Sequence, residues 1–456
     1  MMKQDNTPAS VFQWLDNLKF NRFHLMLMVL TGVNLISVGC GTQIMAYVIP
    51  PMLKEWGLTP VEAGQMASYG FLGNVIGSVG FGILSDQIGR KKSMILALLA
   101  FSLFSGASYF APGFKIFCVL RLLAGLGLGG ALPLSTALIS EFAPTKIRAK
   151  AITGTFMGFT GGWVVAALVP MVVNPLWGWR MVFLLGFIPL LFIPVLWVYL
   201  PESVRFLASK GKYEEAKEEV HRVERLGGLK TIAWTTDHFG QFAGLQAHGG
   251  FRKLFSPRLI VMTILVWLSY FFTLMAIFAL STWLPHLLIK SGFSMAKSFS
   301  YGVVQAIGAM VGGISIGYLM DAFGRKAGLL VTFLLGGLAV IMFGMVSSPV
   351  TLYAVGALIG VFVISSPTML HVVAAETYPT EIRATGAGWA VTVGKIGAVV
   401  APLLGGVLHQ AGLSFSQFCM VWSIPCFICV ILVLLYRVNV RGEALETATV
   451  RLLAEK

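Results

Sequence analysis

The chain has 456 residues, of which 57% are hydrophobic and only 11% are charged. Soluble globular domains carry about one quarter charged residues, so this composition excludes a water-soluble protein and indicates one with several membrane spans. The formal net charge of +14 is distributed over the loops between apolar segments, which argues against a nucleic-acid-binding surface.

Twelve apolar segments follow one another along the chain, each long enough to cross about 30 Å of hydrocarbon. The first six are expected at 25–49, 65–84, 93–112, 115–139, 150–173 and 181–200. The second six are expected at 259–285, 298–319, 328–347, 350–374, 385–408 and 415–436. We therefore expect an all-α membrane protein with twelve transmembrane helices in two six-helix, pseudo-symmetric halves.

Polar segments that interrupt this series define the expected units. These are an N-terminal six-helix bundle at 1–200, a cytoplasmic linker with a short amphipathic helix at 201–257, a C-terminal six-helix bundle at 258–437 and a cytoplasmic tail at 438–456. Lys and Arg are concentrated before helix 1, in the linker and after the even-numbered helices. The positive-inside rule then predicts that both termini lie in the cytoplasm and that the protein resides in the inner or plasma membrane.

Two sequence motifs occur twice, 235 residues apart. GILSDQIGRKK at Gly82–Lys92 corresponds to GYLMDAFGRKA at Gly317–Ala327, and SEFAPTKIRA at Ser140–Ala149 corresponds to AETYPTEIRA at Ala375–Ala384. One common offset indicates that half of the protein has been duplicated, as in many secondary transporters. The paired charges of these loops are the expected gating residues: Asp86, Arg90, Glu141, Arg148, Asp321, Arg325, Glu376 and Arg383.

These motifs resemble those of the major facilitator superfamily over nearly the whole chain. GILSDQIGRKK looks like the signature between helices 2 and 3, RLLAGLGLGG at Arg121–Gly130 is similar to the helix 4 motif, and PESVRFL at Pro201–Leu207 is similar to the segment that closes helix 6. ETYPTEIRATGAG at Glu376–Gly388 resembles the aromatic acid:proton symporters and the niacin-type carriers. The resemblance implies alternating access, an aromatic or heterocyclic carboxylate as the substrate, and proton symport.

Helix 1 departs from the pattern of those symporters. Their Asp-Gly-aromatic-Asp tetrapeptide aligns with Val38, Gly39, Cys40 and Gly41, so both carboxylates are missing. In the family these carboxylates are tied to substrate binding and to proton coupling. Three modes of transport therefore stay open, namely proton symport, uniport and anion exchange.

Three basic residues lie inside the expected spans, where an ionisable group costs at least about 2.5–3.5 kcal/mol and marks a functional position. They are Arg121 in helix 4, His371 in helix 10 and Lys395 near the middle of helix 11. None has a charged counterpart at the matching position of the other half. We expect Arg121 and Lys395 to bind a small organic anion and His371 to carry a proton. The structural alternatives are a brace for helix 4, a snorkelling lysine and a solvated histidine.

Four further polar side chains are candidates for substrate binding: Gln43, Asn74, Tyr270 and Gln305. The alternative for each is an ordinary hydrogen bond between helices. Tyr270 belongs to an aromatic stripe of helix 7 that extends to Phe278 and suits either a flat substrate ring or core packing. The CxxC sequence at Cys426 is interpreted as helix packing, and we expect neither a metal site nor a cofactor.

The leading hypothesis is a monomeric secondary transporter in the lipid bilayer, with a small organic anion as its substrate and protons as the coupled ion. A drug or metabolite efflux carrier is an alternative, although Gly154–Gly162 lacks the proline of the similar antiporter motif. A non-transporting membrane sensor is an alternative from another class, and the short linker without a signalling motif disfavours it. An enzyme is not expected, because the sequence shows no nucleophile–base constellation.

Overall fold

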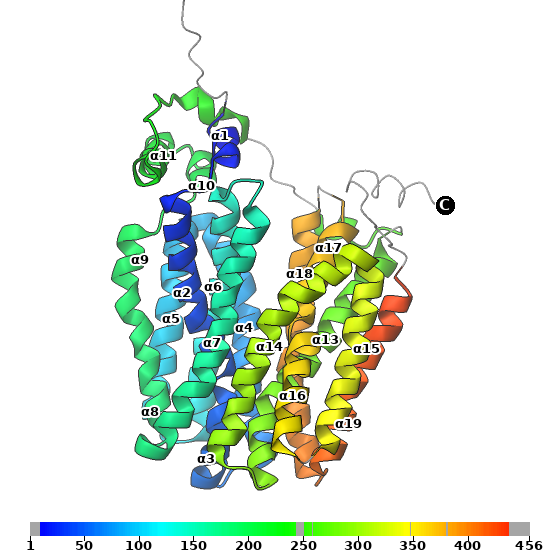
Figure 1. Cartoon of the computed structure of the whole chain (residues 1–456). Coiled ribbons are helices and arrows are strands. Elements are labelled where there is room, and N and C mark those ends of the chain that lie inside the picture. The colour runs from blue at the N-terminus through cyan, green and yellow to red at the C-terminus, as the bar shows by residue number, and fades with distance from the viewer. Residues whose placement is uncertain (1–9, 243–249, 258, 347, 380–381, 437–456) are drawn as a thin grey trace, which may run out of the picture.

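The computed structural model describes residues 10–242, 250–257, 259–346, 348–379 and 382–436, and no β-strand occurs among them. Figure 1 shows two upright helical bundles side by side, with the linker elements at one end of the first bundle. We call this end of the molecule the linker end and the opposite end the distal end.

The N-terminal half contains the first six spans. They are α2 (Arg22–Gln43) and α3 (Met45–Trp56) for helix 1, α4 (Pro60–Ile88) for helix 2, α5 (Arg90–Ala107) and η1 (Ser108–Phe110) for helix 3, α6 (Phe114–Phe142) for helix 4, α7 (Arg148–Trp177) for helix 5, and α8 (Trp179–Leu184), η2 (Leu185–Phe192) and α9 (Ile193–Tyr199) for helix 6.

The C-terminal half contains the other six. They are α13 (Ile260–Lys290) for helix 7, α14 (Met295–Phe323) for helix 8, α15 (Arg325–Met345) for helix 9, α16 (Pro349–Ile359), η4 (Gly360–Ile364) and α17 (Ser366–Thr377) for helix 10, α18 (Arg383–Gln410) for helix 11 and α19 (Phe415–Leu434) for helix 12. The linker contributes α10 (Val204–Ser209), α11 (Tyr213–Gly227), η3 (Thr236–Phe242) and α12 (Gly250–Lys253), and α1 (Val11–Asn17) precedes helix 1.

Twelve helices in the described part of the chain are long and apolar enough to cross a membrane, which confirms the predicted number. Most helices extend beyond the predicted apolar segments. The first segment, predicted at 25–49, lies within a helical span from Arg22 to Trp56. The extension has a simple cause, because helical backbone hydrogen bonds continue past the hydrocarbon region as long as local signals allow.

Local sequence signals explain where individual helices begin. Helix 2 starts with a capping box, in which the Thr59 hydroxyl accepts from the Glu62 amide at 3.3 Å and a Glu62 carboxylate oxygen accepts from the Thr59 amide at 2.8 Å. Pro60 at the first helical position fits because it has no amide proton to leave unpaired. The repeated glycines of the two motifs, Gly89 (φ 101°) and Gly324 (φ 95°), take the left-handed backbone region at the turns between helices 2 and 3 and helices 8 and 9.

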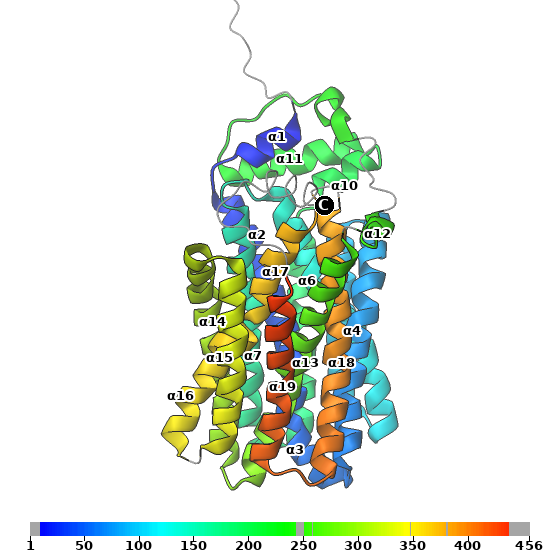
Figure 2. The ribbon, with the colours of Figure 1, turned by 90° about the vertical axis from the view of Figure 1, so that its right-hand side faces the viewer.

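The helices of each half pack into one bundle, and the two bundles meet most extensively along three helix pairs. Helix 2 lies against helix 4, helix 1 against helix 5, and helix 7 against helix 11. Between the halves, α4 packs on α18, α7 on α14, and α3 on α13; Figure 2 shows α4 beside α18. Helices 2 and 4 approach so closely that a Cβ atom added at Gly125 would lie 2.2 Å from the Gly70 carbonyl oxygen.

The linker forms a small subdomain on the N-terminal half. Its helix α11 buries Ala216, Val220 and Val223 and packs on α2. The carboxylate of Glu224 is 1% exposed and accepts a hydrogen bond from Trp234 Nε1 at 2.9 Å. The compact subdomain therefore has both an apolar core and a satisfied buried charge.

Candidate functional site

Contacts between the halves gather at the distal end. A Cβ atom added at Gly64 would lie 2.4 Å from the Pro402 carbonyl oxygen, and one added at Gly406 would lie 2.5 Å from that of Pro60. Nearer the middle of the spans, the Ser68 hydroxyl donates to the Val399 carbonyl at 2.6 Å. These contacts join helices 2 and 11 backbone to backbone, so the distal end is closed in this conformation.

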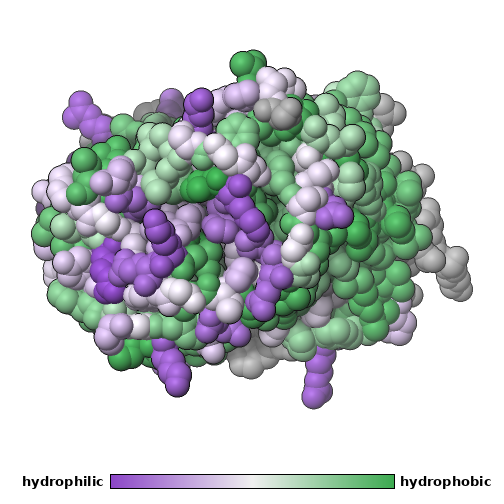
Figure 3. All heavy atoms as spheres, turned by 90° about the horizontal axis from the view of Figure 1, so that it is seen from below, coloured by the Kyte–Doolittle hydropathy of each residue, from purple (hydrophilic) through white to green (hydrophobic). Residues whose placement is uncertain are grey.

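The distribution of hydrophobic and hydrophilic residues on the outer surface agrees with a protein that spans a membrane. Figure 3 views the distal face, where hydrophilic side chains lie over the loops and hydrophobic side chains cover the flank on the right. Helices 1 and 8 add a further contact between the halves, because the Tyr47 and Phe299 ring centroids are 5.0 Å apart. Apolar flanks suit lipid, and a polar face suits water.

Lys395 lies near the middle of helix 11, on the face that meets the other half. It precedes Val399, Pro402 and Gly406 by four, seven and eleven residues, and this spacing puts all four on one side of a helix. The side chain is half-buried, and within the described residues it has no hydrogen-bond or ion-pair partner. An unpaired ammonium group thus faces the interface of the halves, just where their close contact ends.

Aromatic rings from both halves meet at about the same depth. Phe278 of helix 7 lies between two rings of the N-terminal half, with centroid distances of 4.4 Å to Phe71 of helix 2 and 6.1 Å to Trp163 of helix 5. We call these three residues the central aromatic group. The register of helices 2 and 11, which pairs Ser68 with Val399, brings Lys395 to the level of Phe71 one turn further on. Flat apolar faces and a cation therefore lie at the same level of the interface between the halves.

Trp163 carries a polar atom without a partner. Its side chain is 5% exposed, and its Nε1 atom is buried and has no acceptor among the residues that the structure describes. An indole N–H can only donate. Leaving such a donor unpaired costs about 1–3 kcal/mol, and an acceptor at this position would remove that cost.

The other neutral candidates differ in their surroundings. Gln43 is buried and donates from Nε2 to the Ser281 carbonyl at 3.2 Å, which ties helix 1 to helix 7. Asn74 and Gln305 lie near the middle of helices 2 and 8, and Asn74 Oδ1 and Gln305 Nε2 are buried without a partner in the described structure. Gln43 is thus engaged in closing the distal end, whereas the other two keep free hydrogen-bonding capacity.

His371 and Tyr270 form a pair closer to the linker end. Their ring centroids are 5.6 Å apart in an edge-to-face arrangement. His371 is exposed although it lies within a span, whereas Tyr270 is 1% exposed and its hydroxyl has no partner among the described residues. The structure therefore brings these two candidates together on helices 7 and 10 of one half.

Arg121 is enclosed by its own half. Its guanidinium donates to the hydroxyls of Ser105 at 3.1 Å and Ser108 at 3.2 Å, both on helix 3. The same group lies 4.8 Å from the centre of the Phe183 ring on helix 6 and 5.6 Å from that of Phe117. These partners draw Arg121 toward helices 3 and 6, whereas Lys395 faces the other half.

The predicted gating charges pair within each half. Arg90 lies 2.6 Å from Asp86 and 3.7 Å from Glu141, and in the second half Arg325 lies 3.0 Å from Glu376. These repeated charges thus form equivalent clusters at the linker end. The side chain of Asp321, which completes the second cluster in the sequence, lies outside the described part.

Two acidic residues outside the repeated motifs complete the linker end. Arg148 binds Asp16 of α1 at 2.5 Å, and its counterpart Arg383 starts helix 11. Glu202 caps helix 3 by accepting from the Arg90 amide at 2.7 Å and the Lys91 amide at 3.2 Å. A carboxylate ahead of a helix is a familiar cap, but nothing in the sequence places residue 202 beside residue 90.

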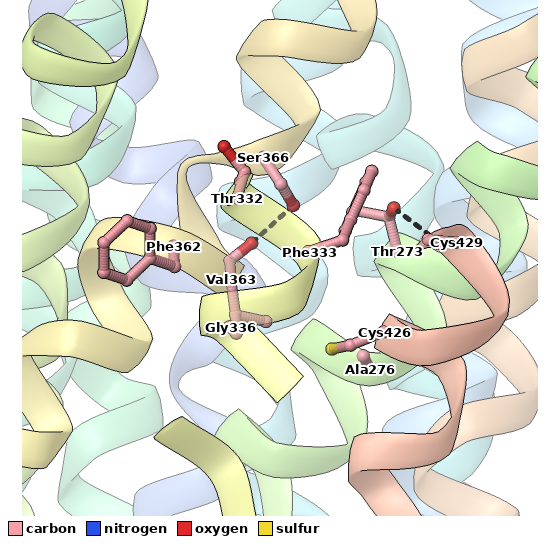
Figure 4. A pocket seen from close by; sticks show the side chains of 10 residues that line it. All are labelled: Thr273, Ala276, Thr332, Phe333, Gly336, Phe362, Val363, Ser366, Cys426 and Cys429. Carbon is pink, nitrogen blue, oxygen red and sulfur yellow. Dashed lines mark hydrogen bonds between the residues drawn. The ribbon is translucent and has the colours of Figure 1, made fainter. Parts of the chain in front are cut away.

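A separate void inside the C-terminal half is too small to hold a water molecule. Figure 4 shows its lining, which comes from helices 7, 9, 10 and 12. Its hydroxyls are already satisfied: Ser366 donates to the Val363 carbonyl at 2.6 Å, and Thr273 lies 3.6 Å from Cys429 Sγ. The void does not involve the N-terminal half, so it is not the site that alternating access requires.

Two six-helix halves joined at one end, with unpaired polar groups where they meet, are the architecture of a secondary transporter. The chain belongs to the major facilitator superfamily, since the family model described as Sugar (and other) transporter matches residues 28–450. It is similar in fold to the inward open conformation of the xylose transporter XylE from E. coli, with a TM-score of 0.77 and 18% identity, over 94% of this chain and 99% of that one.

Curated relatives are similar over nearly their whole length. The niacin transporter NiaP of Acinetobacter baylyi is 33% identical over 95% of this chain and 98% of its own. The gallate transporter of Pseudomonas putida is 33% identical, over 92% and 94%. The benzoate transport protein of Acinetobacter baylyi is 30% identical, over 93% and 92%. The family and these relatives are transporters and not enzymes, as the sequence predicted.

Proposed function

We propose that this chain carries small aromatic or heteroaromatic carboxylates across the membrane by alternating access. The observation that supports this most strongly is Lys395, a cation near mid-membrane on the face between the halves that has no partner among the residues the structure describes. An ammonium group near mid-membrane without a counter-ion is costly, and a carboxylate ligand removes that cost. The central aromatic group supplies flat faces for the ring, and relatives named for niacin, gallate and benzoate support the same substrate class.

Each candidate residue has a place in this proposal. Lys395 binds the carboxylate, and Asn74 and Gln305 hydrogen-bond its polar edges. Arg121 already has two hydroxyl partners, so we assign it to bracing helix 4 in this conformation. Gln43 belongs to the closed distal end.

The direction of access and the coupled ion complete the proposal. The linker end carries most of the basic loops, so it faces the cytoplasm, and the closed distal end makes this an inward-facing state. His371 is the proton carrier, because its ring is exposed inside a span. Helix 1 offers no carboxylate that could take this role. Tyr270, packed against it, positions the ring.

Uptake into proteoliposomes tests the carrier function. Labelled nicotinate and benzoate should enter, and Lys395→Ala should abolish saturable uptake whereas Lys395→Arg retains part of it, because Arg keeps the charge. Lys297→Ala, at an exposed distal position, is the matched control. Uptake that is equal in Lys395→Ala and in the wild type would refute the site.

An imposed pH gradient tests the coupling. Proton symport predicts uptake that rises when the outside is acidic, and His371→Gln should remove this dependence. Uptake that is indifferent to the gradient in the wild type would point to uniport or anion exchange.

A further inference from the structure

Trp163 is the residue of the central aromatic group whose chemistry the proposed function leaves unused. It lies near the middle of helix 5, a span that packs against helix 8 of the other half. Its ring contacts Phe278 across the interface, and its Nε1 donor is buried without an acceptor among the described residues. This donor lies at mid-membrane between two halves that move relative to each other. A substrate that binds there can supply the missing acceptor.

In the described part of the chain, two other tryptophans, Trp267 and Trp422, also have buried Nε1 atoms without an acceptor, but their positions differ. Trp422 is 1% exposed inside helix 12 and its ring packs on Phe418 of the same helix. Trp267 packs on Phe255 and Trp389 toward the linker end of the C-terminal half. Only Trp163 of these three touches an aromatic ring of the opposite half, so burial alone does not single it out.

The arrangement of the rings shows where a substrate ring can lie. Phe278 comes from the C-terminal half, and its two neighbours Phe71 and Trp163 come from the N-terminal half. Relative motion of the halves must therefore separate Phe278 from at least one of them. A flat substrate ring can then take the vacated place, with the indole edge beside it and Lys395 at the level of Phe71.

We infer that Trp163 determines specificity by donating its Nε1–H to an acceptor on the substrate ring. The substrate class is thereby narrowed to aromatic carboxylates that carry a ring acceptor, such as a pyridine nitrogen or a ring hydroxyl oxygen. A plain phenyl ring leaves the indole donor unpaired, and sites that lose such a partner discriminate strongly. This inference rests on the proposed function, in which Lys395 binds the carboxylate.

Nicotinate and benzoate make a matched pair of ligands, since they differ by one ring atom and share the carboxylate. Calorimetric titration of the purified full chain should give nicotinate at least tenfold tighter binding than benzoate. In Trp163→Phe the ratio of the two affinities should fall to about one. Trp163→Tyr keeps a donor and should retain part of the preference, and Trp422→Phe is the control that leaves the ratio at its wild-type value.

The outcomes separate the inference from the function beneath it. Equal affinities in the wild type, or a ratio that Trp163→Phe leaves unchanged, would overturn the role of Trp163 while binding to Lys395 stands. Failure of both ligands to bind, or binding that Lys395→Ala does not weaken, would overturn the proposed function itself. Because the wild-type ratio alone decides the first point, the test holds even if the phenylalanine variant does not fold.

Discussion

Gln43 of helix 1 donates a hydrogen bond from Nε2 to the Ser281 carbonyl oxygen of helix 7, 3.2 Å away, and so links the two halves at the distal end. Both residues are buried, so water does not compete with the bond in this conformation. The link belongs to the closed distal end alone, since opening must separate helices 1 and 7. Its strength therefore contributes to the balance between the two access states.

We predict that Gln43→Ala shifts this balance toward the distal-open state by about 1 kcal/mol, or roughly fivefold. Spin labels can be attached at Lys54→Cys and Lys290→Cys, which are exposed distal positions of the two halves. The shift should increase the fraction of long distances between the two labels. The five native cysteines are replaced beforehand. Thr42→Ala is the control, because the Thr42 hydroxyl donates to the Gly39 carbonyl of its own helix. Identical distance distributions in Gln43→Ala and Thr42→Ala would contradict the prediction.

Gly64→Ala should prevent the distal end from closing. The added Cβ atom would lie 2.4 Å from the backbone oxygen of Pro402, and backbone cannot rotate away as a side chain can. Overpacking of this kind costs about 1–3 kcal/mol, all of it in the closed state, so uptake should fall about tenfold or more. Gly80→Ala on the same helix has no atom within 4 Å and should transport normally. A fully active Gly64→Ala would show that helices 2 and 11 do not form the distal closure.

Arg121→Ala should reduce stability more than it reduces substrate affinity. The change removes two hydrogen bonds to Ser105 and Ser108 and the contact with the Phe183 ring, at a cost of about 2–4 kcal/mol. Thermal unfolding in detergent measures the first effect, and calorimetric titration with nicotinate the second. A normal melting temperature together with lost nicotinate binding would contradict this prediction and would support a role for Arg121 in substrate binding.

The linker subdomain should lose stability as the pH rises. Burial raises the pKa of the Glu219 carboxyl above its ordinary value, so the folded subdomain holds this proton more tightly than the unfolded chain does. Stability is then greatest below about pH 4, near the ordinary glutamate pKa, and falls as the pH rises through the raised value. Glu219→Gln should therefore unfold at a higher temperature than the wild type at pH 7 and at the same temperature near pH 4. Glu218→Gln, at the exposed neighbouring position, should show no such pH-dependent gain.

The sequence predicted the class of fold well because two independent patterns agreed. The duplicated motif at Asp86 and Asp321 and the twelve apolar segments both depend on local composition, and a membrane restricts the possible structures severely. The depth of Lys395 could likewise be counted along helix 11. The depth of a residue in the membrane, together with its type, can therefore be predicted from a single sequence.

Rotation about the helix axis could not be read in the same way. Arg121 and Lys395 are both basic residues inside spans, but one faces its own bundle and the other faces the partner half. That difference is set by packing between neighbouring helices. Phe71, Trp163 and Phe278 were missed as a group for the same reason, since aromatic residues are frequent in apolar spans and their meeting is tertiary. A signal did exist for Trp163, because a tryptophan at mid-span needs a partner for its N–H.

Up to Phe242 the linker subdomain packs on the N-terminal half, since α11 lies against α2 and Asp16 of α1 binds Arg148. By contrast, α12 packs on α18 of the other half. Each half therefore carries a helix that lies in water, outside the hydrocarbon: α11 on the N-terminal half and α12 on the C-terminal half. A pair of fluorophores, one on α11 and one on α12, would follow each transport cycle as a change in energy transfer without touching the substrate path. A cytoplasmic protein that bound α11 and α12 at the same time would hold the two halves together and would therefore stop transport.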